Sequence, residues 1–521
     1  MNSLFRKHHT TCKNAHLLYK AALCIIGTFA ISCTSNIVSK QQVQYAMDSS
    51  GNNYQQLQNV LSHYRDDPQK LQAARYLIAN MIYHRGLEDH IVSPNGEYHE
   101  LDLKKFSTKT WAAKKYCDSL FKEGYTLKST FVPDITSLDS EFLINNIDLA
   151  FEVWQMPWAK HLSFKEFCYY ILPYRSANEK ACPLRREFME RYLPIVQASG
   201  ATTPLEACIA LNNQLCKEIR YLDTGSPLSP TIESIQETGV GNCLGLAIYT
   251  TFAMRSVGIP VIIDQTIWPK MATGHAWCSV LNYNNKFYDF NPGDRFDSTS
   301  RIAWYREKKL RIPAKVYRIM FHPQSTTFLS NIQNDNFYSY LKIPILADAT
   351  EHYPFRPINV CTTTDMPIVS KNGLIYLCVF NRHQWVPIAL GQRQQNRCVF
   401  KKVIGDNVFI IADSPNGEDL RNITAPFFVD SLGNIQKFIP NPAISDSVIL
   451  PKMTLSKNHL NFWNVKEQRF ETIEHCDTIS DSTVMYKHIP HNALLLYAFP
   501  PHAWHDARIF YLNKEGETCI Y

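Results

Sequence analysis

The fold is decided by residues 239–260, which read GVGNCLGLAIYTTFAMRSVGIP, and by residues 274–292, which read GHAWCSVLNYNNKFYDFNP. In the first stretch, a glycine-rich turn is followed by an apolar run from Leu244 to Val257, which predicts a helix. Gly258-Ile259-Pro260 then supplies the glycine and the proline that commonly end a helix. In the second stretch, a strand from Gly274 to Leu281, a turn and a second apolar strand predict a hairpin.

Cys243 is expected at the N-terminus of the predicted helix, where a cysteine has the features of a nucleophile. Unpaired backbone N–H groups and the positive end of the helix dipole favour a thiolate at such a position. The same N–H groups can stabilise an oxyanion. Gly241 allows a tight turn and the close approach of a substrate, and is therefore a candidate substrate-binding residue.

His275 begins the first strand of the predicted hairpin, and two candidate partners follow on the second strand. Asp289 and Asn291 are two residues apart, so their side chains share one face of the strand. A base within reach of a cysteine, oriented by an amide or a carboxylate, is the arrangement of a catalytic triad. In such a triad His275 takes the thiol proton and later protonates the leaving amine.

These motifs resemble the transglutaminase-like branch of the papain-like cysteine enzymes. That family has a Gly-x-Cys at a helix start, an Arg-x-x-Gly-Ile-Pro helix end, a His-Ala-Trp strand and a Trp-x-x-x-Asp-Pro strand. The matching residues are Gly241-Asn242-Cys243, Arg255 to Pro260 and His275-Ala276-Trp277. The resemblance implies an α+β papain-like core and a Cys–His catalytic pair.

The fourth motif departs from the family pattern. Phe287 replaces the tryptophan, and Asn291 stands where the family has its aspartate. Motif alignment favours Asn291 as the residue that orients His275, while Asp289 remains the alternative if the strand register shifts by two residues. The resemblance implies that Trp277 shelters the site, where it is expected to contact substrate, while packing within the hairpin is an equally good alternative role for this residue.

The N-terminus has the pattern of an export signal. Basic residues precede a short apolar run from Ala21 to Ile31, and the run ends in Ser32-Cys33. This pattern resembles a bacterial lipoprotein signal over residues 1–33, which implies lipidation of Cys33 and anchoring in the cell envelope, at the outer membrane. An ordinary signal peptide with an incidental cysteine is the alternative.

The remaining sequence divides the chain into regions. We expect a tether over residues 34–50, a helical domain over 51–200, a transglutaminase-like core over 201–343 and a β-sandwich region of one or two domains over 344–521. The fold class is thus multidomain α+β, with a helical N-terminal domain and an all-β C-terminal part. The chain also resembles large lipoproteins of Gram-negative gut bacteria that combine such parts.

Composition excludes several classes of function. The net charge of +6 on 521 residues is too dilute for nucleic-acid binding. No uninterrupted apolar run reaches the 18 residues that suggest a transmembrane helix. The 15 cysteines are scattered without a CxxC pair, which is typical of buried free thiols and gives no support for a metal site. No cofactor is expected.

The sequence therefore predicts a cysteine-dependent acyl-transfer enzyme of the cell envelope. Its expected partner is a peptide, protein or cell-wall amide, which it hydrolyses through a thioester on Cys243. The alternative is a catalytically inactive, transglutaminase-like surface protein that binds a glycan or a peptide.

Overall fold

The computed structural model describes the chain from residue 37 onward, with gaps. The described residues are 37–271, 273–295, 312–324, 341, 343–370, 374–394, 397–416, 419–452, 459–474, 476–498, 507–513 and 515–520. The predicted signal peptide, including Cys33, lies outside these residues. Within the described ranges, no helix combines the length and the apolar character required to cross a membrane.

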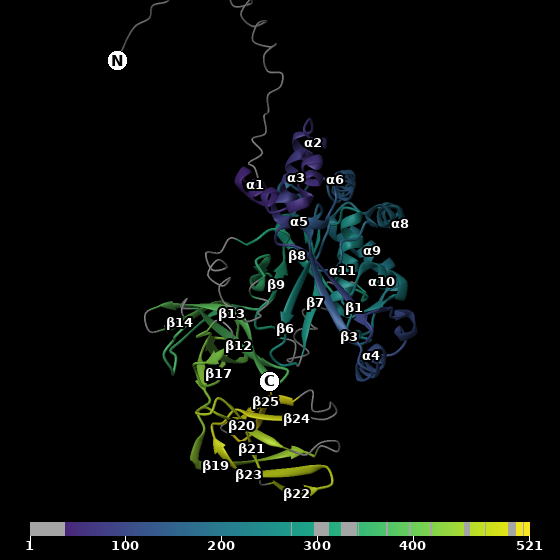
Figure 1. The fold of residues 1–521 in the computed structure, drawn as a ribbon. Helices are drawn as coiled ribbons and strands as arrows, with labels where there is room; N and C mark the ends of the chain where they lie inside the picture. The colour runs from purple at the N-terminus through teal and green to yellow at the C-terminus, as the bar shows by residue number, and fades with distance from the viewer. Residues whose placement is uncertain are drawn as a thin grey trace, which may run out of the picture.

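Helices from the N-terminal part of the chain gather at the top of Figure 1. Their bounds are α1 (Lys40–Asp48), α2 (Tyr54–His63), α3 (Pro68–Met81), α5 (Asp134–Ser137) and α6 (Ser140–Trp154). Helix α7 (Phe164–Tyr170) follows them in the chain. Helix α1 corrects the expectation of a tether over residues 34–50. Ser39 caps this helix, and Val43, Ala46 and Met47 are buried against the neighbouring helices.

A small sheet interrupts the region over residues 51–200 that the periodicity predicts as helical. Its order is β2-β1-β3, and the elements are β1 (Arg85–Val92), β2 (Tyr98–His99), α4 (Ala112–Lys122) and β3 (Thr126–Pro133). Strand β3 is exposed along almost its whole length. An exposed strand needs no alternation of apolar and polar residues, and β3 has none, so its sequence does not identify it as a strand.

The central part of the chain confirms the helix and the hairpin predicted from the two decisive stretches. Its helices are α8 (Arg185–Ala198), α9 (Pro204–Glu218), α10 (Ile232–Thr238) and α11 (Cys243–Ser256). Its sheet has the order β10-β9-β6-β7-β8, formed by β6 (Val261–Ile267), β7 (Gly274–Asn282), β8 (Lys286–Phe290), β9 (Tyr317–Ile319) and β10 (Leu346–Asp348). Helices α9 and α11 pack against β7.

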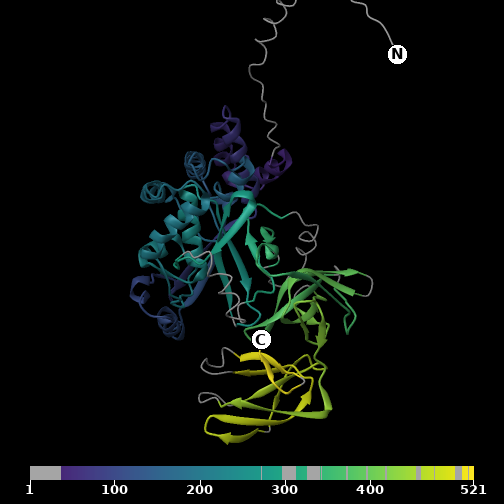
Figure 2. The ribbon, with the colours of Figure 1, turned by 180° about the vertical axis from the view of Figure 1, so that it is seen from behind.

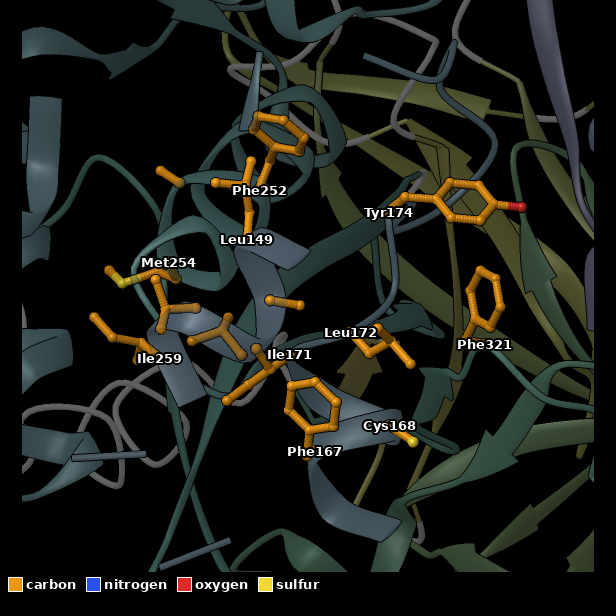
Figure 3. Packing of buried hydrophobic residues seen from close by; sticks show 14 of the residues in the cluster. Leu149, Phe167, Cys168, Ile171, Leu172, Tyr174, Phe252, Met254, Ile259 and Phe321 are labelled. Atoms are coloured by element: carbon orange, nitrogen blue, oxygen red, sulfur yellow. The ribbon is translucent and has the colours of Figure 1, made fainter. Parts of the chain in front are cut away.

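A single hydrophobic cluster joins the N-terminal helices to this central sheet. Figure 3 shows part of the cluster, with Leu149 of α6, Phe167 of α7 and Phe252 of α11 among its members. The cluster extends from Val43 to Ile345. One core is therefore continuous across the boundary that the sequence analysis places at residue 200.

The Arg-x-x-Gly-Ile-Pro motif fastens the end of α11 within this core. Arg255 is buried and donates hydrogen bonds to the carbonyl oxygens of Val261 and Arg175 at 3.0 and 2.9 Å. Gly258 has a φ of +79°, and a Cβ atom there would lie 2.5 Å from the Val153 carbonyl oxygen. The motif thus serves packing between α11, β6 and α6.

The C-terminal part consists of strands, arranged in two units below the core (Figures 1 and 2). The first unit is a sheet of order β11-β14-β13-β12-β15-β17-β18, with β16 paired to β15. Its strands are β11 (Pro357–Thr362), β12 (Ile375–Asn381), β13 (Gln384–Gln394), β14 (Arg397–Ile404), β15 (Asn407–Asp413), β16 (Arg421–Asn422), β17 (Phe427–Val429) and β18 (Ile435–Lys437). One hydrophobic cluster draws on β11 to β15 and on β17.

The second unit packs two sheets around a separate cluster that contains Leu450, Tyr486 and Leu495. The sheets have the orders β19-β23-β22 and β21-β20-β24-β25-β26. Their strands are β19 (Asn441–Pro451), β20 (Leu460–Asn464), β21 (Arg469–Ile473), β22 (Cys476–Ser480), β23 (Thr483–His491), β24 (Leu495–Ala498), β25 (Ala507–Leu512) and β26 (Thr518–Ile520). Each unit thus has a cluster of its own, and a third cluster, which includes Tyr376 and Val408 of the first unit and Trp463 and Leu496 of the second, joins them.

Candidate active site

Cys243 is the first residue of α11 and is half-buried. The side chain of Asn242 caps the helix by accepting a hydrogen bond from the Gly245 N–H at 2.9 Å. Just before the cap, β5 (Val240–Gly241) pairs with β4 (Arg220–Tyr221), so hydrogen bonds to β4 hold the backbone that leads to the cysteine. The sequence correctly predicts this placement of Cys243.

The hairpin of β7 and β8 brings His275 and Asn291 together. His275 Nε2 lies 3.2 Å from Asn291 Oδ1. Because an amide oxygen only accepts, Nε2 carries the hydrogen in this contact, and Nδ1 is the ring nitrogen able to take a proton. Asp289, the alternative partner, lies opposite Ser279, further along β7. The geometry thus brings Asn291 against the imidazole.

The Cys243 thiol lies next to the strand residue that follows His275. The backbone N–H of Ala276 donates a hydrogen bond toward this thiol and so lowers its pKa, as does the N–H of Leu244. Burial has the largest effect, however, and the pKa of the Cys243 thiol is raised overall. The N–H groups at the helix N-terminus therefore favour the thiolate, as expected, but removal of the sulfur from water outweighs their effect on the pKa.

We expect the rate at which iodoacetamide alkylates Cys243 to rise about tenfold per pH unit between pH 6 and pH 8. The sign follows from the raised pKa of this thiol, since the reactive thiolate fraction grows with pH until the pKa is passed. Peptide mass mapping at each pH separates Cys243 from the exposed Cys361, which serves as the reference thiol. A plateau already reached at pH 6 would show a preformed thiolate and contradict this prediction.

The Trp277 ring stacks against the imidazole of His275. The burial of Trp277 corrects its expected role in substrate contact. Its side chain is only 1% exposed. The rings of Trp268, His275 and Trp277 stack, with centroids 5.5 Å apart between His275 and Trp277 and 6.0 Å apart between Trp268 and His275. Trp277 Nε1 donates a hydrogen bond to the Tyr353 hydroxyl at 2.6 Å. The tryptophan therefore fixes the plane of the imidazole and has almost no surface left for a substrate.

Through Tyr353, Trp277 is connected to a buried polar network that the sequence analysis does not predict. Asp264 is fully buried, and it accepts hydrogen bonds from Tyr353, from Ser279 and from two guanidinium nitrogens of Arg318 at 2.7 to 2.8 Å. The Arg318 guanidinium also lies 3.5 Å above the ring of Phe287, the residue that replaces the family tryptophan. These residues are far apart in sequence, so no local spacing reveals them.

The first β-rich unit holds the connection that leads to His275. Asn381, at the end of β12, is buried and donates hydrogen bonds to the carbonyl oxygens of Trp268, Met271 and Thr273 at 2.9, 2.7 and 3.1 Å. These three carbonyl groups lie between β6 and β7, directly before the strand that carries the imidazole. Asn381 is therefore a positioning residue for His275.

We expect Asn381→Ala to slow catalysis about tenfold and to lower the free energy of unfolding by about 1–3 kcal/mol. The substitution removes the side-chain donor from all three carbonyl groups and lets the connection before His275 move, although the Met271 and Thr273 carbonyl oxygens keep the backbone N–H donors of Thr273 and Trp268. Asn492→Ala is the control, because Asn492 also donates to two carbonyl groups, those of Lys437 and Ile439, at the second unit. Equal effects of the two substitutions on catalysis would contradict a positioning role.

Gly241 is constrained by packing, and its assignment as a substrate-binding residue stays a prediction. A Cβ atom at Gly241 would lie 2.5 Å from Ile235 Cδ1 of α10. The exposed residue beside the cysteine is instead Tyr221, which pairs with Gly241 and is 61% exposed. Burial raises the pKa of Tyr221, and the charges of Asp223 and Cys243 raise it further, so these three side chains lie close together.

Comparison with known families gives one result for this site. Residues 194–292 match the model of the transglutaminase-like superfamily. This transglutaminase-like core extends from α8 to Pro292 and thus contains Cys243, His275 and Asn291. No curated protein matches the chain. The strand-rich C-terminal units lie outside the matched residues.

Proposed function

We propose that the protein is a cysteine-dependent acyl-transfer enzyme that hydrolyses amide or peptide bonds through a thioester on Cys243. The observation that carries this proposal is the 3.2 Å contact between His275 Nε2 and Asn291 Oδ1. The residue after His275, Ala276, donates its backbone N–H toward the Cys243 thiol. The match of residues 194–292 to the transglutaminase-like superfamily supports cysteine-based chemistry in the segment that contains Cys243, His275 and Asn291.

The proposed reaction has two steps. In the first, Cys243 Sγ attacks the substrate carbonyl carbon while His275 Nδ1 takes the thiol proton, and Asn291 holds the resulting imidazolium. The C–N bond then breaks, and the amine or ammonia leaves with the proton from His275. In the second step His275 removes a proton from water, which attacks the thioester, and the carboxylic acid product leaves as the thiol is restored. Backbone N–H groups at the start of α11 are placed to stabilise the oxyanion in both steps.

Because the pKa of the Cys243 thiol is raised, His275 acts as a general base during the attack. Hydrolysis is favoured over cross-linking, since water is always present and the sequence identifies no acceptor site for a nucleophilic amine.

The proposal also places the enzyme in the cell envelope, anchored through a lipid on Cys33. This part rests on the N-terminal sequence pattern alone. Metabolic labelling with a fatty acid tests it, because the label is expected to disappear in Cys33→Ala, and persistence of the label would contradict lipidation at this residue.

A peptide-amide library incubated in ¹⁸O-labelled water tests the catalytic function. Hydrolysis adds one ¹⁸O atom to the new carboxylate, whereas transamidation adds none, so product masses distinguish the two reactions. We expect labelled products with the wild type and with the control Cys361→Ala, and loss of at least about 10³-fold in their rate of formation with Cys243→Ala. Equal product formation by all three proteins would contradict Cys243 catalysis. If none of them forms product, an inactive binding protein becomes the better account.

A further inference from the structure

A small cavity adjoins the backbone that leads into Cys243. Its volume is about 60 Å³. One wall is the segment 222–230, another is α10, and Gly241 and Asn242 line the side next to the cysteine. A backbone hydrogen bond of 3.0 Å from Leu222 N–H to the Gly241 carbonyl joins two of these walls. A substrate group attached close to the reacting carbonyl can therefore enter this cavity.

Asp223 places a carboxylate in the wall of this cavity. Its Oδ1 atom accepts a hydrogen bond from the Gly225 N–H at 2.9 Å. No lysine, arginine or histidine in the described parts of the chain forms an ion pair with Asp223. A half-buried carboxylate is usually paired with a cation. Because Asp223 has no such partner among the described residues, its negative charge is available to a ligand.

The loop that carries Asp223 is held firmly in place. The Asp223 carbonyl oxygen accepts a hydrogen bond from the Trp111 N–H at 3.0 Å, and the Thr224 carbonyl oxygen accepts from the Ala113 N–H at 3.0 Å. These bonds fix the loop to the start of α4. The carboxylate therefore keeps its position beside Cys243 without the ligand, as a preorganised recognition site requires.

The charge of Asp223 also acts on the nucleophile. Burial raises the pKa of the Cys243 thiol most, and the negative charge of the Asp223 side chain raises it further. A carboxylate in this position opposes the thiolate while it is unpaired. A cation bound to Asp223 removes this opposition, so such a ligand and an ionised Cys243 favour each other.

We propose that Asp223 binds a positively charged primary amino group of the substrate, carried on a short chain next to the carbonyl that Cys243 attacks. This inference rests on the proposed function and adds the substrate class, an amide whose acyl part bears an ammonium group. The free amino terminus of a peptide and a lysine side chain share this chemistry. An amine bound as ammonium has no lone pair for attack, so the site recognises the acyl donor.

Thiol-reactive probes of opposite charge test this proposal without a known substrate. Ethylammonium and ethylsulfonate methanethiosulfonates both form a disulfide with the thiolate and release methanesulfinate. Their rates at Cys243, read by peptide mass mapping, are divided by their rates with 2-mercaptoethanol. We expect the ammonium reagent to be favoured about tenfold in the wild type and by less than about twofold in Asp223→Asn.

Asp118→Asn is the matched control, because Asp118 lies on α4, pairs with Lys114 at 2.7 Å and carries the same charge. It is expected to keep the tenfold preference. The uncharged methyl methanethiosulfonate reports whether Asp223→Asn leaves the thiol accessible. An unchanged preference in Asp223→Asn, or an equal loss in Asp118→Asn, would overturn the proposal.

A further pair of reagents separates the two sources of the ammonium group. A preference confined to the aminoethyl reagent supports a free amino terminus, and a stronger preference for an aminohexyl reagent supports a lysine side chain. The charge preference does not depend on turnover. Failure of the Cys243→Ala test in the peptide-amide library would therefore refute the enzymatic function and leave the charge preference as a separate result.

Discussion

Replacement of His275 by alanine is expected to slow amide hydrolysis by about 10³-fold, with little change in the thermal unfolding temperature. The raised pKa of Cys243 leaves the thiol protonated at neutral pH, so the attack depends on a base that removes its proton. We assign this task to His275 Nδ1, because Nε2 contacts Asn291. Initial rates with a substrate found in the peptide-amide library measure the effect.

His491→Ala is the control for this substitution. His491 lies in the second β-rich unit, where its Nδ1 atom is 3.0 Å from Asp446 Oδ2. It is expected to leave the rate unchanged within about twofold. A loss of less than tenfold in His275→Ala would mean that another group removes the thiol proton, and the assigned roles would be wrong.

The residue that orients His275 gives the second large expected effect. Asn291→Ala is expected to reduce the rate by about 10²-fold, because the imidazole loses the acceptor that fixes its tautomer and its plane. Asp289→Ala is expected to change the rate by less than about threefold, since Asp289 lies opposite Ser279 on the hairpin. The same steady-state assay compares both variants.

Asn291→Asp provides a conservative test of the same role. It introduces the residue that the resembling family has at this position, and it keeps an acceptor oxygen within reach of Nε2. We expect its rate to lie within about tenfold of the wild type. A larger loss in Asp289→Ala than in Asn291→Ala would identify Asp289 as the orienting residue and reverse the assignment.

Local sequence patterns predict the parts of this molecule whose structure depends on near neighbours. Cys243 at a helix start, the helix end at Gly258 and the strand that begins with His275 are all confirmed. Each depends on capping, turn residues or alternation within about 20 residues, which a single sequence displays directly. The C-terminal part from residue 344, expected to be all-β, is likewise rich in strands.

Features that depend on distant contacts are not visible in the sequence. Asp264, Arg318 and Tyr353 form one buried network from three separate segments. The raised pKa of Cys243 depends on how deeply the sulfur is buried, which no motif encodes. The sequence does not predict the exposed strand β3, because β3 has no alternating pattern of apolar and polar residues.

The central claim is that Cys243 carries the acyl group, and trapping that acyl group tests it most directly. p-Nitrophenyl acetate is a suitable probe, because attack by the thiol transfers an acetyl group to sulfur and releases p-nitrophenolate. Peptide mass mapping then locates the acetyl group, and its removal by hydroxylamine identifies a thioester. We expect a burst of p-nitrophenolate with the acetyl group on Cys243, and a burst at least about 10²-fold slower in His275→Ala. Acetylation of lysines or other cysteines with Cys243 unmodified would contradict the account.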